Sequence, residues 1–151
     1  MHVSQKCQYA LRAIFELAKR AGEGPVKIGD VVQAQAIPQR FLEVILSQLK
    51  QGGFVESRRG AEGGYFLVRS AEELTVGEIV RFVEGPMSLV DCVAAGGKAK
   101  CPMDGSCVFM PIWERVQDAV SDVYDNTTFQ KLVEEEERMR MSGNMVLNYS
   151  I

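Results

Sequence analysis

Apolar side chains recur at helical spacing in three successive segments of the first fifty residues, and this pattern constrains the fold most strongly. It predicts amphipathic helices over residues 4–21, 28–36 and 38–51, each with one apolar side. Pro38 suits the first turn of the third helix, and the pair Gly52-Gly53 ends that helix. The beginning of the chain is therefore expected to be helical.

A β-hairpin is predicted directly after the three helices. Residues 54–57 and 65–68 have the composition of short strands, and the glycine-rich loop 58–64 joins them. Three helices followed by such a hairpin are the layout of a winged helix-turn-helix domain. We expect a mainly α fold with a small β-hairpin wing, completed by a long helix after the cysteines.

The whole chain divides into four expected parts. Thr75 and Glu78 form a capping box that begins a fourth helix ending near Glu84, so the DNA-binding domain is placed at residues 1–84. A glycine-containing, cysteine-bearing loop is expected at 85–110. The helical region 111–141 has a cap at Thr127 or Thr128 that restarts it, and 142–151 is expected to be a flexible tail.

Charge is distributed unevenly between the two halves of the chain. The net charge is −3, but residues 1–70 hold 10 Lys and Arg against 6 Asp and Glu, whereas residues 71–151 hold 7 against 14. A basic half beside an acidic half is typical of a protein that binds nucleic acid through one part only.

The expected DNA contacts come from the third helix and from the wing. Polar residues at the start of the third helix lie opposite its apolar stripe and can pair with base edges. Arginines on a thin loop can enter a narrow minor groove. The alternatives are an ordinary polar surface and a plain hairpin. The candidate DNA-binding residues are Gln39, Arg40, Glu43, Arg58, Arg59, Gly60, Gly63 and Gly64.

Three of the four cysteines, Cys92, Cys101 and Cys107, lie within 16 residues on the predicted loop. Their spacing lacks the tight pairs of a structural zinc site, whereas thiolates are the usual ligands of iron–sulfur clusters. We expect a cluster on these three cysteines; a thiol–disulfide sensor and unrelated buried cysteines are the alternatives. Cys7, on the first helix, is a candidate fourth ligand, and Asp91 and Asp104 offer carboxylates.

Other functions are not favoured by the sequence. It shows no nucleophile–base pair, no phosphate-binding loop and a single histidine, so we do not expect an enzyme. A small iron–sulfur electron carrier would need neither the third helix nor the wing. No apolar run is long enough for a membrane helix and the start lacks an apolar signal segment, so we expect a cytoplasmic protein that does not bind membranes.

The chain resembles the Rrf2 family of bacterial regulators, of the IscR, NsrR and RirA type, over roughly residues 1–135. Five segments carry the resemblance. They are Ser4 to Ala13, Ile37 to Leu49, the wing from Arg59 to Leu67, Leu74 to Val80, and the cysteine loop with the helix after it.

The resemblance implies a homodimeric winged-helix repressor that binds a pseudo-palindromic operator, with residues 111–141 as the dimerisation helix region. It also implies a [2Fe–2S] or [4Fe–4S] cluster on Cys92, Cys101 and Cys107, whose loss reports redox, nitric oxide or iron status. Where relatives carry a fourth ligand, this chain has Met110 and Gln8, which leaves Cys7 as the substitute. A cluster-free member that senses thiols or acts as an adaptor is the alternative. The expected dimer interface comprises Ile112, Val116, Ala119, Val120 and Val123.

Overall fold

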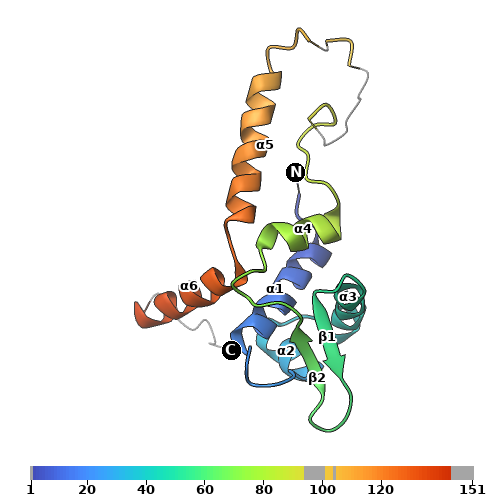
Figure 1. Cartoon of the computed structure of the whole chain (residues 1–151), viewed down its shortest axis with the longest axis vertical. Helices are drawn as coiled ribbons and strands as arrows, with labels where there is room; N and C mark the ends of the chain where they lie inside the picture. Colours follow the sequence, from blue (N-terminus) through green and yellow to red (C-terminus); the bar gives the residue numbers. More distant parts are fainter. Residues whose placement is uncertain (1, 94–100, 104, 144–151) are drawn as a thin grey trace.

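The structure is a computed structural model that describes residues 2–93, 101–103 and 105–143. Figure 1 shows a body from which one long helix projects, with the β-hairpin at the opposite end. The mainly α fold with a small hairpin is therefore confirmed. In chain order the elements are α1 (Gln5–Lys19), α2 (Ile28–Gln35), α3 (Gln39–Gln51), β1 (Val55–Arg58), β2 (Gly64–Leu67), α4 (Val76–Glu84), α5 (Met110–Asp125) and α6 (Phe129–Met141).

Helix α1 lies at the centre of the body and contacts α2, α3, α4 and α6. Ser4 caps its first turn, because the Ser4 hydroxyl accepts a hydrogen bond from the Cys7 N–H. Three of its buried residues are alanines at positions 10, 13 and 18, and their small side chains let the neighbouring helices approach closely. The largest wholly buried apolar side chains around it are Ile14, Leu17, Ile37, Leu42, Leu46, Leu49, Leu74, Ile79 and Phe129.

The turn between α2 and α3 differs from the sequence prediction by one residue. The second helix was expected to reach Ala36, but it ends at Gln35 because Ala36 adopts a left-handed conformation, with φ 49° and ψ 46°. The Arg12 guanidinium donates a hydrogen bond to the Gln35 carbonyl and so satisfies one of the free acceptors at this helix end. The reversal at Ala36 directs the chain into α3.

The wing is an antiparallel pair in which Val55 lies opposite Leu67 and Arg58 opposite Gly64. Val26 forms an additional bridge to Tyr65, with both backbone hydrogen bonds at 2.8 Å. This bridge joins the hairpin to the segment between α1 and α2, so the wing has a fixed position beside the helices.

The predicted helical region 111–141 is two helices that pack differently. None of the residues of α5, all of which the structure describes, is buried, whereas α6 returns to the body and places Phe129 in the core. Backbone contacts join the start of α6 to the start of α4, since the Val76 N–H donates to the Thr127 carbonyl at 2.9 Å. Lys19 and Glu136 add an ion pair at 2.8 Å between α1 and α6. Figure 1 shows α6 beside the body and α5 leading away from it.

Among the residues that the structure describes, no helix has both the length and the apolar character needed to cross a bilayer.

Candidate nucleic-acid interface and cysteine segment

Helix α3, called the recognition helix below, has one buried side and one exposed side. Leu42, Ile45, Leu46 and Leu49 are buried, while Gln39, Arg40 and Glu43 are exposed as the sequence analysis expected. The Gln39 amide donates to Glu43 Oε1 at 3.0 Å, and the Arg40 guanidinium lies 4.8 Å from the centre of the Phe41 ring. These contacts restrain the three polar side chains on the exposed side of the helix in the protein alone.

The wing tip needs glycine at three positions. Gly60 has a φ of 108°, in a region that other residues rarely adopt. A Cβ atom at Gly63 would lie 2.2 Å from the Arg58 carbonyl oxygen, and one at Gly64 would lie 2.3 Å from the Val26 carbonyl oxygen. The loop is therefore narrow, and it presents Arg59 at an exposed position.

The arginines of both surfaces are available for phosphates or bases. In the described part of the chain, neither Arg40, Arg58 nor Arg59 forms an ion pair. Arg58 instead lies 6.0 Å from the centre of the Phe66 ring. An arginine without a carboxylate partner has no ion pair to break when it binds a phosphate. These three arginines therefore suit a surface that binds nucleic acid.

The three clustered cysteines lie on the segment between α4 and α5, called the cysteine segment below. Cys92, Cys101 and Cys107 are free thiols of intermediate exposure. Residues 94–100 and Asp104 of the expected loop, like residues 144–151 of the expected tail, lie outside the described residues. Figure 1 shows the described residues directly before α5 at the end of that helix that is far from the wing.

The first residues of the cysteine segment are joined to α5. Gly85 ends α4 with a φ of 86°. Four residues later, the Leu89 N–H donates to the side-chain oxygen of Gln117 in α5 at 3.3 Å. An ion pair with two hydrogen bonds, at 2.7 and 2.6 Å, also joins Arg81 of α4 to Asp125 of α5. The Arg81 guanidinium lowers the pKa of Asp125 below its ordinary value.

The donor chemistry of the segment suits an iron–sulfur cluster, because three accessible thiols on one segment can become thiolate ligands. In the described residues, however, no three His, Cys, Asp or Glu side chains lie close enough to hold a metal ion. Binding of a cluster would therefore require the segment to bring its three sulfur atoms together.

Cys7, the candidate fourth ligand, lies in the core. Its side chain is wholly buried, and burial together with the neighbouring Glu84 carboxylate raises its thiol pKa to about 11. Glu84 also accepts hydrogen bonds from the Ser4 N–H at 2.9 Å and the Ser4 hydroxyl at 2.5 Å. In this conformation Ser4 joins the start of α1 to the end of α4, and Cys7 is a buried, neutral thiol beside that junction.

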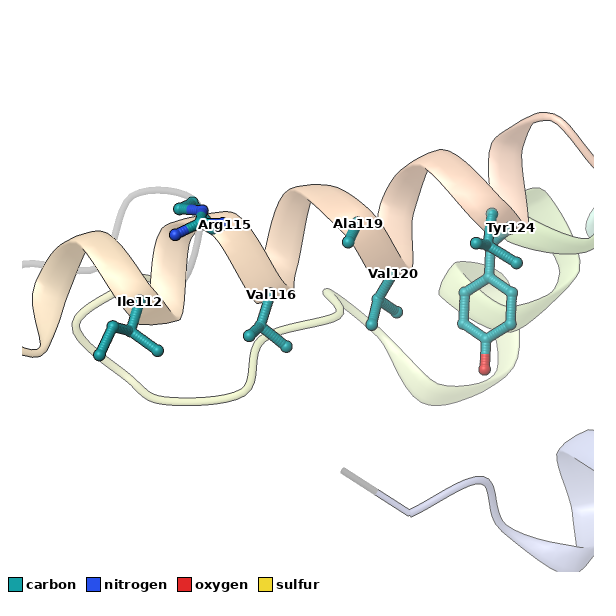
Figure 2. A pocket seen from close by; sticks show the side chains of 7 residues that line it. Ile112, Arg115, Val116, Ala119, Val120 and Tyr124 are labelled. Carbon is teal, nitrogen blue, oxygen red and sulfur yellow. The ribbon is translucent and has the colours of Figure 1, made fainter.

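Helix α5 carries an uncovered apolar stripe. Figure 2 shows the side chains of Ile112, Val116, Val120 and Tyr124 projecting from one side of this helix. An open groove of about 650 Å³ follows the stripe. The predicted interface residues Ile112, Val116, Ala119, Val120 and Val123 all line that groove.

One exposed residue of the recognition helix was missed by the sequence analysis. Val44 is apolar and lies on the exposed side, next to Glu43. Its position could have been read from the spacing, since it lies opposite Leu42 and Leu46. The DNA contacts predicted for this helix were all polar side chains, which pair with base edges by hydrogen bonds.

A helix-turn-helix, a basic wing joined to it and an exposed polar recognition helix define a winged-helix regulator of transcription. The family model Rrf2, described as an iron-dependent transcriptional regulator, matches residues 3–135. This chain belongs to the Rrf2 family. The members that it resembles are transcriptional regulators and not enzymes.

Two types of regulator are similar to the chain. The transcriptional regulator CymR of Bacillus subtilis is 37% identical over 132 residues, which cover 87% of this chain and 89% of CymR. IscR of Pectobacterium carotovorum is 33% identical over 137 residues, covering 91% of this chain and 82% of IscR.

Solved structures of CymR and IscR proteins are also similar to this chain. The structure of B. subtilis CymR, described as the global cysteine regulator, has a TM-score of 0.78 at 35% identity and covers 89% of this chain and 98% of that chain. IscR of T. potens has a TM-score of 0.73 at 30% identity, covering 91% of this chain and 90% of that chain.

Proposed function

We propose that this Rrf2 protein is a homodimeric repressor whose affinity for a pseudo-palindromic operator depends on an iron–sulfur cluster held by Cys92, Cys101 and Cys107. The observation that carries the proposal is the placement of three free, half-exposed thiols between the DNA-binding body and α5. The description of the family as iron-dependent supports iron as the metal that these cysteines bind.

The DNA-binding residues keep the roles that the sequence analysis gave them. Gln39, Arg40 and Glu43 would face base edges in the major groove, where amide, guanidinium and carboxylate groups suit adenine, guanine and cytosine respectively. Arg58 and Arg59, on the loop narrowed by Gly60, Gly63 and Gly64, would enter the minor groove. Two copies related by a two-fold axis would read two half-sites.

The cysteine segment would transmit the signal through the contact that joins its first residues to α5. A bound cluster would supply iron–thiolate bonds and a redox-active centre. Drawing Cys92 towards Cys101 and Cys107 would pull on the Leu89–Gln117 hydrogen bond and so shift α5 relative to α4. If α5 forms the two-fold interface, this shift would change the spacing of the two recognition helices.

The decisive experiment compares one preparation with and without its cluster. Protein purified without air should contain iron and sulfide and show a visible absorption spectrum. The two forms, measured at one salt concentration, should differ in DNA affinity by about 5- to 150-fold, the usual range of allosteric coupling. A Cys92→Ser variant should contain no cluster and should bind DNA as the iron-free form does. Equal affinity of both forms would refute sensing.

DNA binding itself is tested at the wing. Replacement of both Arg58 and Arg59 by Glu should abolish binding of duplex DNA, while the circular dichroism spectrum stays unchanged because both side chains are exposed. A variant with Arg138→Glu and Arg140→Glu on α6, both exposed, is the control that adds the same negative charge. Unchanged DNA binding by the wing variant would contradict the proposed surface.

Thiol sensing without a cluster is a second candidate. The relatives include B. subtilis CymR, described as a cysteine regulator, and an oxidized form of Staphylococcus aureus CymR. An iron-free preparation whose DNA affinity changes on oxidation and recovers on reduction would favour this function. The same three thiols would then act through disulfide formation.

A further inference from the structure

The exposed side of the recognition helix contains an apolar residue at its centre. Helical spacing of about 100° per residue places Val44 opposite the buried Leu42 and Leu46. Its side chain is 56% exposed, and Arg40 and Ser47 lie one turn before it and about one turn after it on the same side. Val44 is thus an apolar contact point within a polar surface.

The neighbouring Phe41 contacts other side chains of the protein. Its ring lies 6.3 Å from the ring of Tyr9 in α1 and has the Arg40 guanidinium above it. A groove of about 530 Å³ between α1 and α3 is lined by Tyr9, Phe41 and Val44, and also by Lys6. The Phe41 ring lies against Tyr9 of α1, and Val44, at 56% against 45% for Phe41, is the more exposed of these two apolar side chains.

The chemistry of the major groove limits what Val44 can contact there. The thymine C5-methyl is the apolar group that base edges display in this groove, and all other distinguishing groups are hydrogen-bond donors or acceptors. Lys6 and Arg40 flank Val44 with positive charge, which suits nearby phosphates more than an apolar protein partner.

We infer that Val44 recognises the C5-methyl group of a thymine, so that each operator half-site contains a thymine beside the bases contacted by Arg40 and Glu43. This inference rests on the proposed DNA-binding function and adds a sequence requirement to it. Val44 is then a specificity-determining residue, because it distinguishes thymine from uracil or cytosine at one position.

The test begins with selection of bound duplexes from a random library, which supplies the operator. Each thymine is then replaced singly by deoxyuridine, which removes only the C5-methyl group. We expect one replacement in each half-site to weaken binding by about 3- to 5-fold at fixed salt, the effect usual for burial of one methyl-sized group. Failure to select any duplex would overturn the proposed function itself.

Single variants, each measured on the thymine and the deoxyuridine duplex, assign the methyl contact to Val44. Val44→Ala should bind the thymine and deoxyuridine duplexes with nearly equal affinity, since the side chain that touches the methyl group is shortened. Val68→Ala removes a valine of similar exposure, 53%, outside the recognition helix, and should keep the full deoxyuridine effect. If duplex binding is intact but no deoxyuridine matters, or Val44→Ala keeps the effect, the inference about Val44 is overturned.

Discussion

The four cysteines of this chain occupy two different environments. Cys92, Cys101 and Cys107 are partly exposed on the cysteine segment, whereas Cys7 is buried beside the Glu84 carboxylate. Thiolates are the reactive form of cysteine, so burial next to a negative charge suppresses reactivity. Their positions in the sequence suggested a cluster site, but the packing of Cys7 depends on how α4 crosses α1, which no local pattern reveals.

Alkylation should distinguish the two environments. In iron-free protein at pH 8, iodoacetamide should label Cys92, Cys101 and Cys107 and leave Cys7 unlabelled until the protein unfolds. Peptide mass spectrometry measures the extent at each site. Equal labelling of all four cysteines in folded protein would contradict the burial of Cys7.

The raised pKa of Cys7 also predicts a pH dependence of stability. Below about pH 9 the thiol is protonated in both states and has no effect. As the pH rises from 9 towards 11, the unfolded chain ionises first, because its pKa is the ordinary 9.0 rather than about 11. The free energy of unfolding should fall by about 2 kcal/mol over this window. Cys7→Ala lacks this thiol. Its free energy of unfolding, measured by denaturation, should therefore fall by about 2 kcal/mol less between pH 9 and pH 11.

At the scale of the elements, helix boundaries were predictable wherever a capping residue or glycine marks them. Thr75 and Glu78 form the expected capping box, and Thr128 caps α6. The end of α2 was misjudged by one residue because alanine rarely adopts the left-handed conformation found at Ala36. That conformation is imposed by the tight turn into α3.

Ala36→Gly should therefore stabilise the protein. Glycine adopts a positive φ without the clash of a Cβ atom, and this relief exceeds the added entropy of the unfolded chain by up to about 1 kcal/mol. Urea denaturation measures the change. The same substitution at Ala34, inside α2, should destabilise by about 1 kcal/mol. A loss of stability at both positions would argue against a left-handed Ala36.

The apolar stripe of α5 makes a prediction about assembly. Val116→Glu places a charge in the groove that we assign to the two-fold interface. Burial of an unpaired carboxylate is costly, so the variant should be monomeric by analytical ultracentrifugation and should bind a full operator weakly. Glu114→Gln, outside the groove-lining residues, is the control. A Val116→Glu protein that remains a dimer would contradict this interface.

The whole molecule consists of a DNA-binding body and a projecting helix, and α6 belongs to the body. The predicted division at residue 84 followed the order of elements along the chain. It did not anticipate that α6 packs on α1, because a helical pattern identifies an apolar side without naming its partner. Phe129 is wholly buried among residues from the first half of the chain.

Phe129→Ala should consequently destabilise the DNA-binding body, although it lies over forty positions beyond residue 84. A cost of about 3–5 kcal/mol is usual for removing a buried phenylalanine. Thermal denaturation should show one cooperative transition at a lower temperature. Phe109→Ala, at an exposed site before α5, should leave the transition nearly unchanged. A negligible effect of Phe129→Ala would mean that α6 is dispensable.

Because synthesis proceeds from the amino end, the surface that receives Phe129 is made well before Phe129 itself. The nascent helices α1 to α4 therefore leave the ribosome with a gap in their hydrophobic interior. We expect the body to reach its native stability only after α6 has been translated. A message truncated within α5 should yield a product that chaperones retain or proteases remove, rather than a small independent DNA binder.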